Sequence, residues 1–562
     1  MKLKVAVVFL FAFVFTSTLN AQDAKGWHLL DPQKDKVYGI SLSETYNFLK
    51  GKKATPVIVA VIDSGIDTAH EDLKNILWTN PKEIPGNGID DDGNGYVDDV
   101  HGWNFLGNKD GTNLKKASDE RTRVYYRFKD EFEGKEVDED TMNENEKAQY
   151  ELWQKAASQM KVDSEDQLEL TLLDVTLKAL EKHNKVLQTE MNKTDFTVDQ
   201  LEDFQPSTVA GRQAKLNYLT VMKLLGVDSD EKNTTLLSEL QEEVEGKKES
   251  FKAKSTPPPD YRAEIIKDNY YDINDRYYGN PDIMGPSPMH GTHVSGIIAA
   301  QRNNNIGMDG VADDVKIMMI RAVPDGDEYD KDVALAIKYA VDNGAKVINM
   351  SFGKGFSPEK KWVDEAVRYA ESKDVLIVHA AGNEAANVDS TDNYPNPYLK
   401  EFDTTATNFI NVGASGDKHI GNGSLVAYFS NYGRNSVDVF APGMKIYSTL
   451  PGGNEYGFLQ GTSMAAPVVA GVAALIRSYY PQLSAQQVKY VIDSSTSQLG
   501  DSVKVIEPGT NKLVTMKDLS ESGGIINAYG AVKLASTLKP EVKEEKAPQL
   551  PKATFKNSKI KE

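Results

Sequence analysis

The chain of 562 residues is long enough to bury a large core, and it carries 64 Lys and Arg against 83 Asp and Glu, a net charge of −19. Such an acidic surface repels phosphate backbones, so nucleic acid is not an expected partner. No cysteine is present, which excludes disulfides, thiol catalysis and a lipid-modified cysteine.

The N-terminus has the pattern of a secretory signal peptide. Two lysines precede an apolar run from Val5 to Phe15, and small and polar residues follow as far as Ala21. This order is typical of an export signal, and the run is too short to be a stable membrane span. We therefore expect residues 1–21 to direct export to the periplasm, the cell surface or the medium, and residues 22–36 to form a short N-terminal segment.

Short apolar runs alternate with helical patterns through much of the chain. The run at 57–62, VIVAVI, is continuous and β-branched, as is typical of a parallel strand buried on both faces. Similar runs recur at 315–320, 346–350, 375–378 and 410–413, with helical patterns such as 331–343 and 359–373 between them. The alternation predicts an α/β fold with a mostly parallel sheet, in which ligands bind at the carboxyl ends of the strands.

The stretch from 110 to 280 has a different composition, rich in Glu, Lys, Leu and Gln. Its leucines recur at a spacing that places them on one face of a helix: Leu170, Leu173, Leu177 and Leu180. The stretch closes with the stiff STPPPDY at 255–261. We expect an inserted, acidic, mainly α-helical module here, and a disordered Lys/Glu/Pro-rich tail over 538–562.

Two segments carry the residue types of a general base and its partner. Asp63 follows the first apolar run, where a carboxylate is positioned for site chemistry, although an Asp in such a place is often a structural cap. In HGTHVSG, His290 and His293 could share a metal, but zinc proteases of that kind need a Glu beside the first His, and Gly291 stands there. The remaining interpretation is that one histidine acts as a general base and the other packs nearby.

Two further segments offer a nucleophile and a hydrogen-bond donor. Ser463, in GTSMAAP, opens an apolar helix, where the helix dipole and free backbone N–H groups stabilise an oxyanion; a simple helix cap is the alternative. Asn383, in AAGN, follows another apolar run and carries an amide N–H that can donate to an oxyanion.

These four segments, VIDSGID, HGTHVSG, AAGN and GTSMAAP, closely resemble, in sequence and in order, the blocks of the subtilisin-like serine endopeptidases, the subtilase family. The resemblance covers residues 37–109 and 281–537. It implies a subtilisin-like three-layer α/β fold over 37–537, interrupted by the insertion at 110–280. It also implies an exported endopeptidase whose substrates are proteins or peptides.

The resemblance assigns a role to each candidate residue. Ser463 would be the nucleophile, His290 the general base, and Asp63 the group that orients the imidazole. Asn383 and the backbone N–H of Ser463 would form the oxyanion hole. NMSFG resembles the substrate-binding strand, and its residues would pair with the main chain of an extended peptide, which favours broad specificity: Ser351, Phe352 and Gly353.

Calcium is the expected cofactor, and no organic cofactor is implied. HEDL at 70–73 and RNNNIGMDGVA at 302–312 resemble the two segments of a calcium site in many subtilases. On that match the ligands would be the side chains of Asp72 and Asn304 and the carbonyls of Arg302, Ile306 and Met308. In DDDGNGYVDD a second site is expected from Asp90, Asp92, Asn94 and Asp98, which have the spacing of an EF-hand-like loop. His101 stands where such a loop has its last Glu, so an Asp-rich turn is the alternative.

One other function remains as an alternative, and a second is excluded. A catalytically silent binding module of the same fold, which would hold a partner with its insertion, is disfavoured because all the triad positions and Asn383 are intact. An esterase of the α/β-hydrolase fold would need Gly-x-Ser-x-Gly and the order Ser, Asp, His, and neither appears. The segment before residue 57 is also too short for the folded prodomain of secreted relatives. The sequence does not indicate an oligomeric state.

Overall fold

The computed structural model describes residues 25–161, 164–225, 232–420, 423–500 and 502–540. The predicted signal peptide and most of the predicted C-terminal tail lie outside the described residues.

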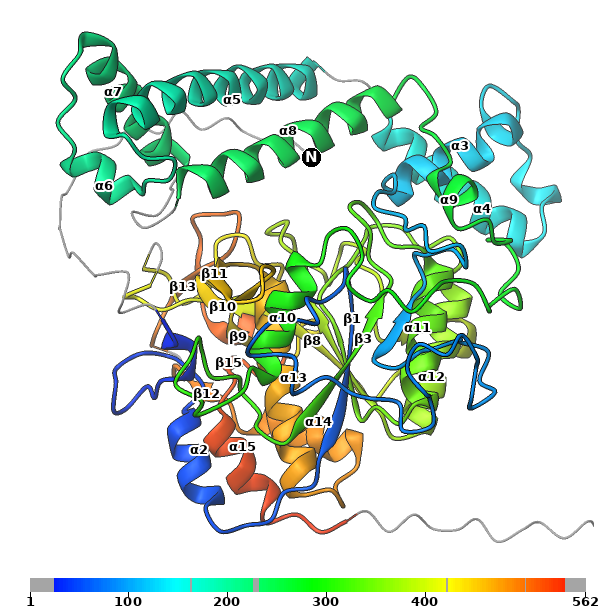
Figure 1. Cartoon of the computed structure of the whole chain (residues 1–562). Helices are drawn as coiled ribbons and strands as arrows, with labels where there is room; N and C mark the ends of the chain where they lie inside the picture. Colours follow the sequence, from blue (N-terminus) through cyan, green and yellow to red (C-terminus); the bar gives the residue numbers. More distant parts are fainter. Residues whose placement is uncertain (1–24, 162–163, 226–231, 421–422, 501, 541–562) are drawn as a thin grey trace, which may run out of the picture.

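A nine-stranded sheet runs through the body of the molecule in the order β12-β15-β9-β8-β5-β4-β1-β3-β2 (Figure 1). Neighbouring strands are parallel except for β12 and β15. The strands are β1 (Val57–Asp63), β2 (Gly102–Asn104), β3 (Val315–Arg321), β4 (Val347–Met350), β5 (Leu376–Ala380), β8 (Phe409–Ser415), β9 (Val439–Pro442), β12 (Ser497–Gln498) and β15 (Gly524–Ile525). The expected parallel α/β sheet is confirmed, and all five apolar runs form its central strands.

Strand β1 shows why these runs are continuous rather than alternating. Val59 and Val61 point into one hydrophobic cluster, whereas Ala60 and Ile62 point into another on the opposite face of the sheet. All four are completely buried. A strand covered by helices on both sides has no solvent face that would favour polar residues.

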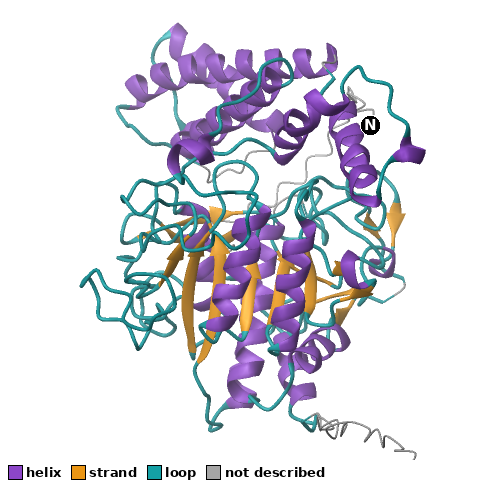
Figure 2. Ribbon diagram, turned by 90° about the vertical axis from the view of Figure 1, so that its right-hand side faces the viewer, coloured by secondary structure: helices purple, strands orange, loops and turns teal. Residues whose placement is uncertain are grey.

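Helices pack against the sheet (Figure 2), and because the hydrophobic clusters on its two faces contain different helices, the fold has three layers. One cluster contains residues of α2 (Leu42–Leu49), α10 (Met289–Ala299), α13 (Thr462–Tyr479), α14 (Ala485–Ser494) and α15 (Ala528–Ala535). The other contains residues of α11 (Asp330–Asp342) and α12 (Lys360–Ser372). Within the described part of the chain, three short antiparallel pairs lie outside the sheet: β6 (Tyr398–Leu399) with β7 (Thr404–Thr405), β10 (Ile446–Leu450) with β11 (Glu455–Leu459), and β13 (Val505–Ile506) with β14 (Leu513–Val514).

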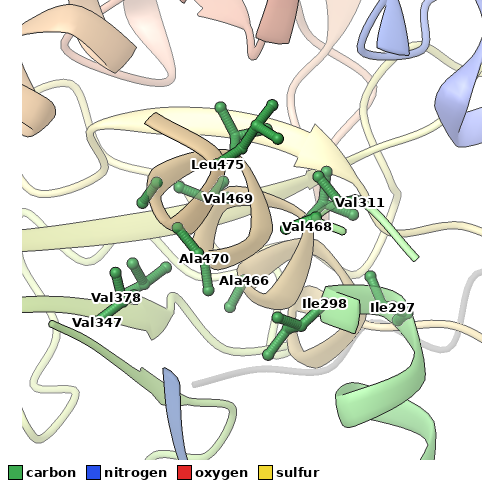
Figure 3. Packing of buried hydrophobic residues seen from close by; sticks show 14 of the residues in the cluster. Ile297, Ile298, Val311, Val347, Val378, Ala466, Val468, Val469, Ala470 and Leu475 are labelled. Atoms are coloured by element: carbon green, nitrogen blue, oxygen red, sulfur yellow. The ribbon is translucent and has the colours of Figure 1, made fainter. Parts of the chain in front are cut away.

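Helix α13 is the centre of the larger cluster (Figure 3). Its small residues allow close packing: a Cβ on Gly471 would lie 2.6 Å from Cβ of Val311. Ile297 and Ile298 of α10 lie beside it, and Val378 of β5 lies in the same cluster. Among the described residues, α13 is the one helix long and apolar enough to cross a membrane, and 89% of it is buried inside the protein.

The described N-terminal residues belong to the body of the protein. Trp27 is buried, and its Nε1 donates to the carbonyl oxygen of Met444 at 3.0 Å. Leu42 and Leu49 of α2 join the same cluster as α13. The segment between the predicted signal peptide and β1 therefore contributes to the core.

The helices of the predicted insertion form two differently packed groups, which Figure 1 shows on one side of the molecule. The helices are α3 (Glu120–Phe132), α4 (Glu144–Gln159), α5 (Ser164–Met191), α6 (Val198–Asp203), α7 (Val209–Leu225), α8 (Asn233–Ala253) and α9 (Tyr261–Ile265). Helices α5 to α8 share a hydrophobic cluster of their own, in which Leu177 and Leu180 of the predicted stripe are buried. In contrast, Phe356 of the body packs with α3 and α4, and Ile266 and Tyr278 belong to the cluster around α11.

Candidate active site

Asp63 and His290 meet at the carboxyl end of the sheet. Asp63 is the last residue of β1, and His290 is the second residue of α10. Nδ1 of His290 lies 2.8 Å from Oδ1 of Asp63. The approach requires Gly291, because a Cβ there would lie 2.2 Å from the carbonyl oxygen of Gly65 and 3.1 Å from Oδ1 of Asp63. The glycine between the two histidines therefore allows α10 to approach β1 closely.

The environment of this pair favours a positively charged imidazole. Asp63 is buried, and its Oδ1 also accepts the N–H of Ser64 at 2.7 Å. Burial alone would lower the pKa of His290, but the negative charge of Asp63 and its hydrogen bond outweigh burial and raise that pKa above its ordinary value. The His290 side chain is 35% exposed, so its ring remains accessible from solvent.

His293 has a different environment from His290. It is completely buried, and its Nε2 lies 3.3 Å from the carbonyl oxygen of Gly457 on β11. Burial lowers the pKa of His293 to about 3, so this imidazole is neutral at physiological pH. A neutral ring packed beneath β11 is a structural residue.

Ser463 lies in the first turn of α13 and interlocks with the end of β4. Its hydroxyl donates to the carbonyl oxygen of Ser351 at 2.9 Å, and the hydroxyl of Ser351 donates back to the carbonyl oxygen of Ser463 at the same distance. In this structure the Ser463 hydroxyl therefore bonds to Ser351 rather than to His290. A rotation about the Cα–Cβ bond would release it, because one hydrogen bond holds it.

Asn383 and the start of α13 border one space. Oδ1 of Asn383 accepts from the N–H of Thr462 at 2.9 Å and from its hydroxyl at 3.0 Å, which leaves the Nδ2 donor for another partner. A Cβ on Gly461 would lie 3.5 Å from that Nδ2 and 3.6 Å from the backbone nitrogen of Ser463. Two N–H donors around one space form the type of arrangement that stabilises an oxyanion.

Asn431 holds the loop that carries Asn383, and the sequence did not point to it. It is buried, and its Nδ2 donates to the carbonyl oxygen of Ala381 at 2.8 Å. Its Oδ1 accepts the N–H of Ala386 at 2.8 Å and that of Glu384 at 3.1 Å. One side chain thus fixes the backbone on both sides of Asn383. A single Asn in a loop has no local pattern that would have identified it.

The expected substrate strand lies beside the Asn383 loop. A Cβ on Gly353 would lie 2.7 Å from Oδ1 of Asn393, whose Nδ2 donates to the carbonyl oxygen of Ala381 at 2.8 Å. Ser351 is buried against α13, Phe352 is half-buried and Gly353 is exposed. The segment 351–353 therefore has an open side next to both Ser463 and the Asn383 loop.

The two segments expected to form the first calcium site are in contact. Asp72 is completely buried, and its carboxylate accepts from the Asn304 side-chain amide and, at 3.3 Å, from the N–H of Met308. The Tyr456 hydroxyl, which the sequence did not suggest, donates to the same carboxylate at 2.9 Å. In this structure N–H and O–H donors surround the Asp72 carboxylate, and calcium at this place stays a prediction. The same loop contains the other two expected ligands, Arg302 and Ile306, and the Ile306 N–H donates to Oδ1 of Asn304 at 3.1 Å.

The second expected site contains a different set of residues from the one its spacing suggested. Carboxylate oxygens of Glu83, Asp90 and Asp92 lie within 4.8 Å of one another. Glu83 is buried, and its Oε2 has no hydrogen-bond partner among the described residues, which fits a bound cation. Asp98 instead accepts the N–H groups of the turn at Gly86 and Gly88, at 2.8 and 2.9 Å.

Asn94 stays close to the acidic cluster of Glu83, Asp90 and Asp92. Its N–H donates to Asp90 at 3.1 Å, and its amide donates to Asp99 at 2.9 Å. The loop spacing missed Glu83 because that residue precedes the loop and reaches it only through the turn at 84–89. An acidic residue just before an Asp-rich loop is the signal that could have indicated it.

Comparisons with known proteins agree with this geometry. The sequence profile described as the subtilase family matches residues 54–531. The thermophilic serine proteinase of Bacillus sp. (strain AK1) is 42% identical over 221 residues, which cover 39% of this chain and 49% of that protein. The intracellular serine protease of Paenibacillus polymyxa is 35% identical over 293 residues, which cover 50% of this chain and 82% of that protein.

A solved protease structure from Pseudoalteromonas arctica aligns with 91% of this chain and 97% of its own, at 19% identity and a TM-score of 0.44. The chain thus spans about half the length of the Bacillus proteinase and most of the length of the Paenibacillus one.

Proposed function

Because this chain belongs to the subtilase family of serine-type endopeptidases, we propose that it hydrolyses peptide bonds in proteins through an acyl-enzyme formed on Ser463. The observation that carries the proposal is the 2.8 Å contact between His290 and Asp63, at the carboxyl end of the sheet. Ser463 and Asn383 supply the remaining functional groups of the reaction, at the N-terminus of α13 and on the loop after β5.

The proposed reaction begins when the Ser463 hydroxyl leaves the carbonyl oxygen of Ser351 and turns toward His290. Nε2 of His290 takes the hydroxyl proton as the serine oxygen attacks the peptide carbonyl. Asp63, bonded to Nδ1, keeps the ring in the tautomer that accepts at Nε2 and stabilises the imidazolium that forms. The raised pKa of His290 reflects that stabilisation.

The negative oxygen of the tetrahedral intermediate would accept from Nδ2 of Asn383 and from the N–H of Ser463. When the intermediate collapses, His290 gives its proton to the leaving amine and the acyl group stays on Ser463. A water molecule then attacks the ester, with His290 again as the base, and releases the carboxylic acid. Each proton that His290 takes is returned, so the enzyme ends in its starting state.

Substrate binding would use the open side of residues 351–353. An extended peptide pairs there through main-chain groups, which every sequence has, so the proposed specificity is broad. Half-buried Phe352 offers an apolar surface to the substrate.

Calcium would be a structural cofactor at two places. Asp72 and Asn304 would hold one ion together with carbonyl oxygens of residues 302–308, and Glu83, Asp90 and Asp92 would hold the other. The ion stabilises the folded state by neutralising clustered carboxylates, and it takes no part in the proposed proton transfers.

Export by the predicted signal peptide completes the proposal. A chain without cysteine keeps its fold in an oxidising compartment without disulfides. The buried Trp27 supports cleavage near residue 21, because the segment that follows belongs to the core. The periplasm, the cell surface and the medium are the compartments to examine.

The first test is hydrolysis of a quenched fluorescent protein substrate by the chain without residues 1–21, with calcium present. Ser463→Ala should reduce the rate to near background, because it removes the proposed nucleophile. Ser478→Ala, at the far end of the same helix and with its hydroxyl unpartnered among the described residues, should keep the wild-type rate.

A folded wild-type chain that binds the protein substrate without cutting it would instead support the silent binding module. The observation that favours this second candidate is the hydrogen bond from the Ser463 hydroxyl to the carbonyl oxygen of Ser351.

A further inference from the structure

The segment that continues the expected substrate strand, Lys354–Phe356, is held by the insertion. Nζ of Lys354 lies 2.6 Å from Oε2 of Glu120 in the first turn of α3, and both side chains are almost fully buried. The same ammonium lies 2.8 Å from Oδ1 of Asp330 and donates to the carbonyl oxygen of Glu328 at 2.8 Å. One buried cation thus joins the substrate segment, the start of α11 and the insertion.

The partners of this cation are themselves fixed. Arg123 of α3 pairs with Glu120 at 2.6 Å and donates to the carbonyl oxygens of Asp327 and Glu328 at 3.0 and 2.9 Å. A buried charge is tolerated only where every member of the network has a partner, so Lys354 has little freedom to move. The first turn of α3 is therefore attached firmly to the loop after β3.

The next two residues are held by the insertion as well. Lys155 of α4 donates to the carbonyl oxygen of Gly355 at 2.7 Å and pairs with Asp392 at 2.6 Å. Phe356 is buried in a hydrophobic cluster with Phe128 of α3 and Met160, just after α4. Each of these three residues thus has at least one contact with α3, α4 or the residue just after α4, while the backbone of Lys354 pairs with Tyr394 of the body.

Helices α5 to α8 are packed in a different way. Their hydrophobic cluster consists of their own residues, and ion pairs such as Lys247 with Glu169 and Lys248 with Asp174 join α8 to α5. The insertion therefore has one part that touches the substrate segment and another that is stabilised mainly by itself.

We propose that α3 and α4 form a wall of the substrate cleft, with Glu120 and Lys155 as positioning residues that hold the substrate strand at the spacing an extended peptide needs. The inference rests on the proposed function. Strand pairing depends on main-chain groups placed within a few tenths of an ångström, and a shift of about 1 Å in a positioning group weakens it strongly. Substrate affinity, rather than the chemical step, therefore depends on α3 and α4.

Lys155 gives the clearest test, because its side chain is partly exposed and its loss leaves no fully buried charge. With internally quenched peptides of extended sequence, Lys155→Ala should raise KM by roughly 3–10-fold and change kcat by less than about twofold. Lys155→Arg should restore KM, because a guanidinium can also donate to the Gly355 carbonyl.

Two matched controls distinguish the loss of the hydrogen bond from Lys155 to Gly355 from the loss of the ion pair of Lys155 and from the general effect of removing a surface lysine. Asp392→Ala removes the ion pair but keeps the hydrogen bond from Lys155 to Gly355, so KM should stay near the wild-type value. Lys178→Ala on α5 removes an exposed pair with Asp174 and should change neither KM nor kcat. An unchanged KM for Lys155→Ala, or an equal fall in kcat and kcat/KM, would overturn the proposal.

A binding measurement tests the same point without catalysis. Fluorescein-labelled casein should bind Ser463→Ala several-fold more tightly than it binds the Ser463→Ala, Lys155→Ala double variant, with the melting temperatures of the two compared. Equal affinities would contradict the role of Lys155. A wild-type chain that binds casein and does not cut it would overturn the proposed function while leaving this affinity comparison intact.

Discussion

The imidazole of His290 lies 2.8 Å from the carboxylate of Asp63 although the two residues are 227 positions apart in the chain. The two ends of the segment between them are joined by a hydrogen bond, in which the N–H of Ile66 donates to the carbonyl oxygen of Ile283 at 3.0 Å. The chain therefore leaves β1 and returns to α10 at one place. The residues between Ile66 and Ile283 therefore do not separate the pair, because the two ends of that segment meet beside it.

The pH dependence of the enzyme should follow the Asp63–His290 pair. Because the pKa of His290 is raised above 6.5, its imidazole becomes neutral, and able to act as the base, at a higher pH than an ordinary histidine does. The value of kcat/KM should therefore rise with pH at an apparent pKa above 6.5. Asp63→Asn should shift this midpoint downward and reduce kcat strongly, since the ring loses its orienting charge. A pH–rate profile from pH 5 to 10 checks both expectations.

The Asp63–His290 pair should stabilise the folded state most at low pH, whereas the activity should rise with pH. A raised pKa means that the folded state binds the proton more tightly, so the contribution is complete below pH 6.5 and is lost as the pH rises through the folded-state value. The gap in melting temperature between wild type and Asp63→Asn should therefore be larger at pH 5 than at pH 9. A constant gap would show that the two groups do not interact as described.

Asn431 should act on catalysis through Asn383. Asn383→Ala should reduce kcat by about 10²–10³-fold, the effect of removing the corresponding donor in subtilisin. Asn431→Ala should reduce kcat by roughly tenfold, because the loop that carries Asn383 loses four hydrogen bonds from one side chain. In the Asn383→Ala background the second substitution should have little further effect on kcat, because the donor it positions is already gone.

A buried asparagine elsewhere provides the control for that cycle. Asn408 is as buried as Asn431, and its amide donates to the carbonyl oxygen of Val375 at 2.7 Å, at the opposite end of the sheet. Asn408→Ala should lower the melting temperature without a selective loss of kcat. Additive losses of kcat in the double variant of Asn383 and Asn431 would argue that Asn431 acts on stability alone.

Calcium removal should lower the melting temperature by several degrees. An ion present at 100 times its Kd stabilises the folded state by about 2.7 kcal/mol, and the shift per kcal/mol, roughly 2–4 °C for domains of 150–250 residues, is nearer about 1–2 °C for this larger chain. Glu83→Gln should reduce the effect of EDTA, because it removes a carboxylate from the cluster with Asp90 and Asp92. Calorimetry with and without EDTA measures the shift.

A substitution of Asp98 tests whether the cation ligands are those that the structure brings together or those that the loop spacing predicts. Its carboxylate caps the turn at 86–88, so Asp98→Asn should leave the EDTA shift unchanged. A smaller shift for Asp98→Asn than for Glu83→Gln would favour the EF-hand-like set of ligands. An unchanged melting temperature of the wild type in EDTA would contradict both calcium sites.

Gly291 should tolerate no side chain. In Gly291→Ala the new Cβ would lie 2.2 Å from the carbonyl oxygen of Gly65, so α10 must move away from Asp63 and kcat/KM should fall at least tenfold. Gly246→Ala, in the middle of α8 with open space around it, should stabilise the chain by about 0.4–1 kcal/mol and leave activity unchanged. Hydrolysis rates and melting curves of the two variants make the comparison. Wild-type activity in Gly291→Ala would contradict the close packing.

The sequence determined the central strands of this protein and indicated the groups that are proposed to react. Continuous apolar runs such as VIVAVI specify buried parallel strands because burial on both faces is a local property of each run. The candidate residues follow strands or open helices, and such positions are visible in the order of the chain. Asp63, His290 and Ser463 could therefore be named before the fold was known.

The tertiary structure alone decided which residues support that site. Glu83 joins Asp90 and Asp92 while Asp98 does not, Asn431 holds the Asn383 loop, and Lys354 binds Glu120 across 234 positions. These contacts link residues with no common spacing or pattern. Their partners are set by how helices and loops pack around the sheet, and the free energy of burying a polar group depends on the neighbours it then meets. No local pattern of residues encodes those neighbours.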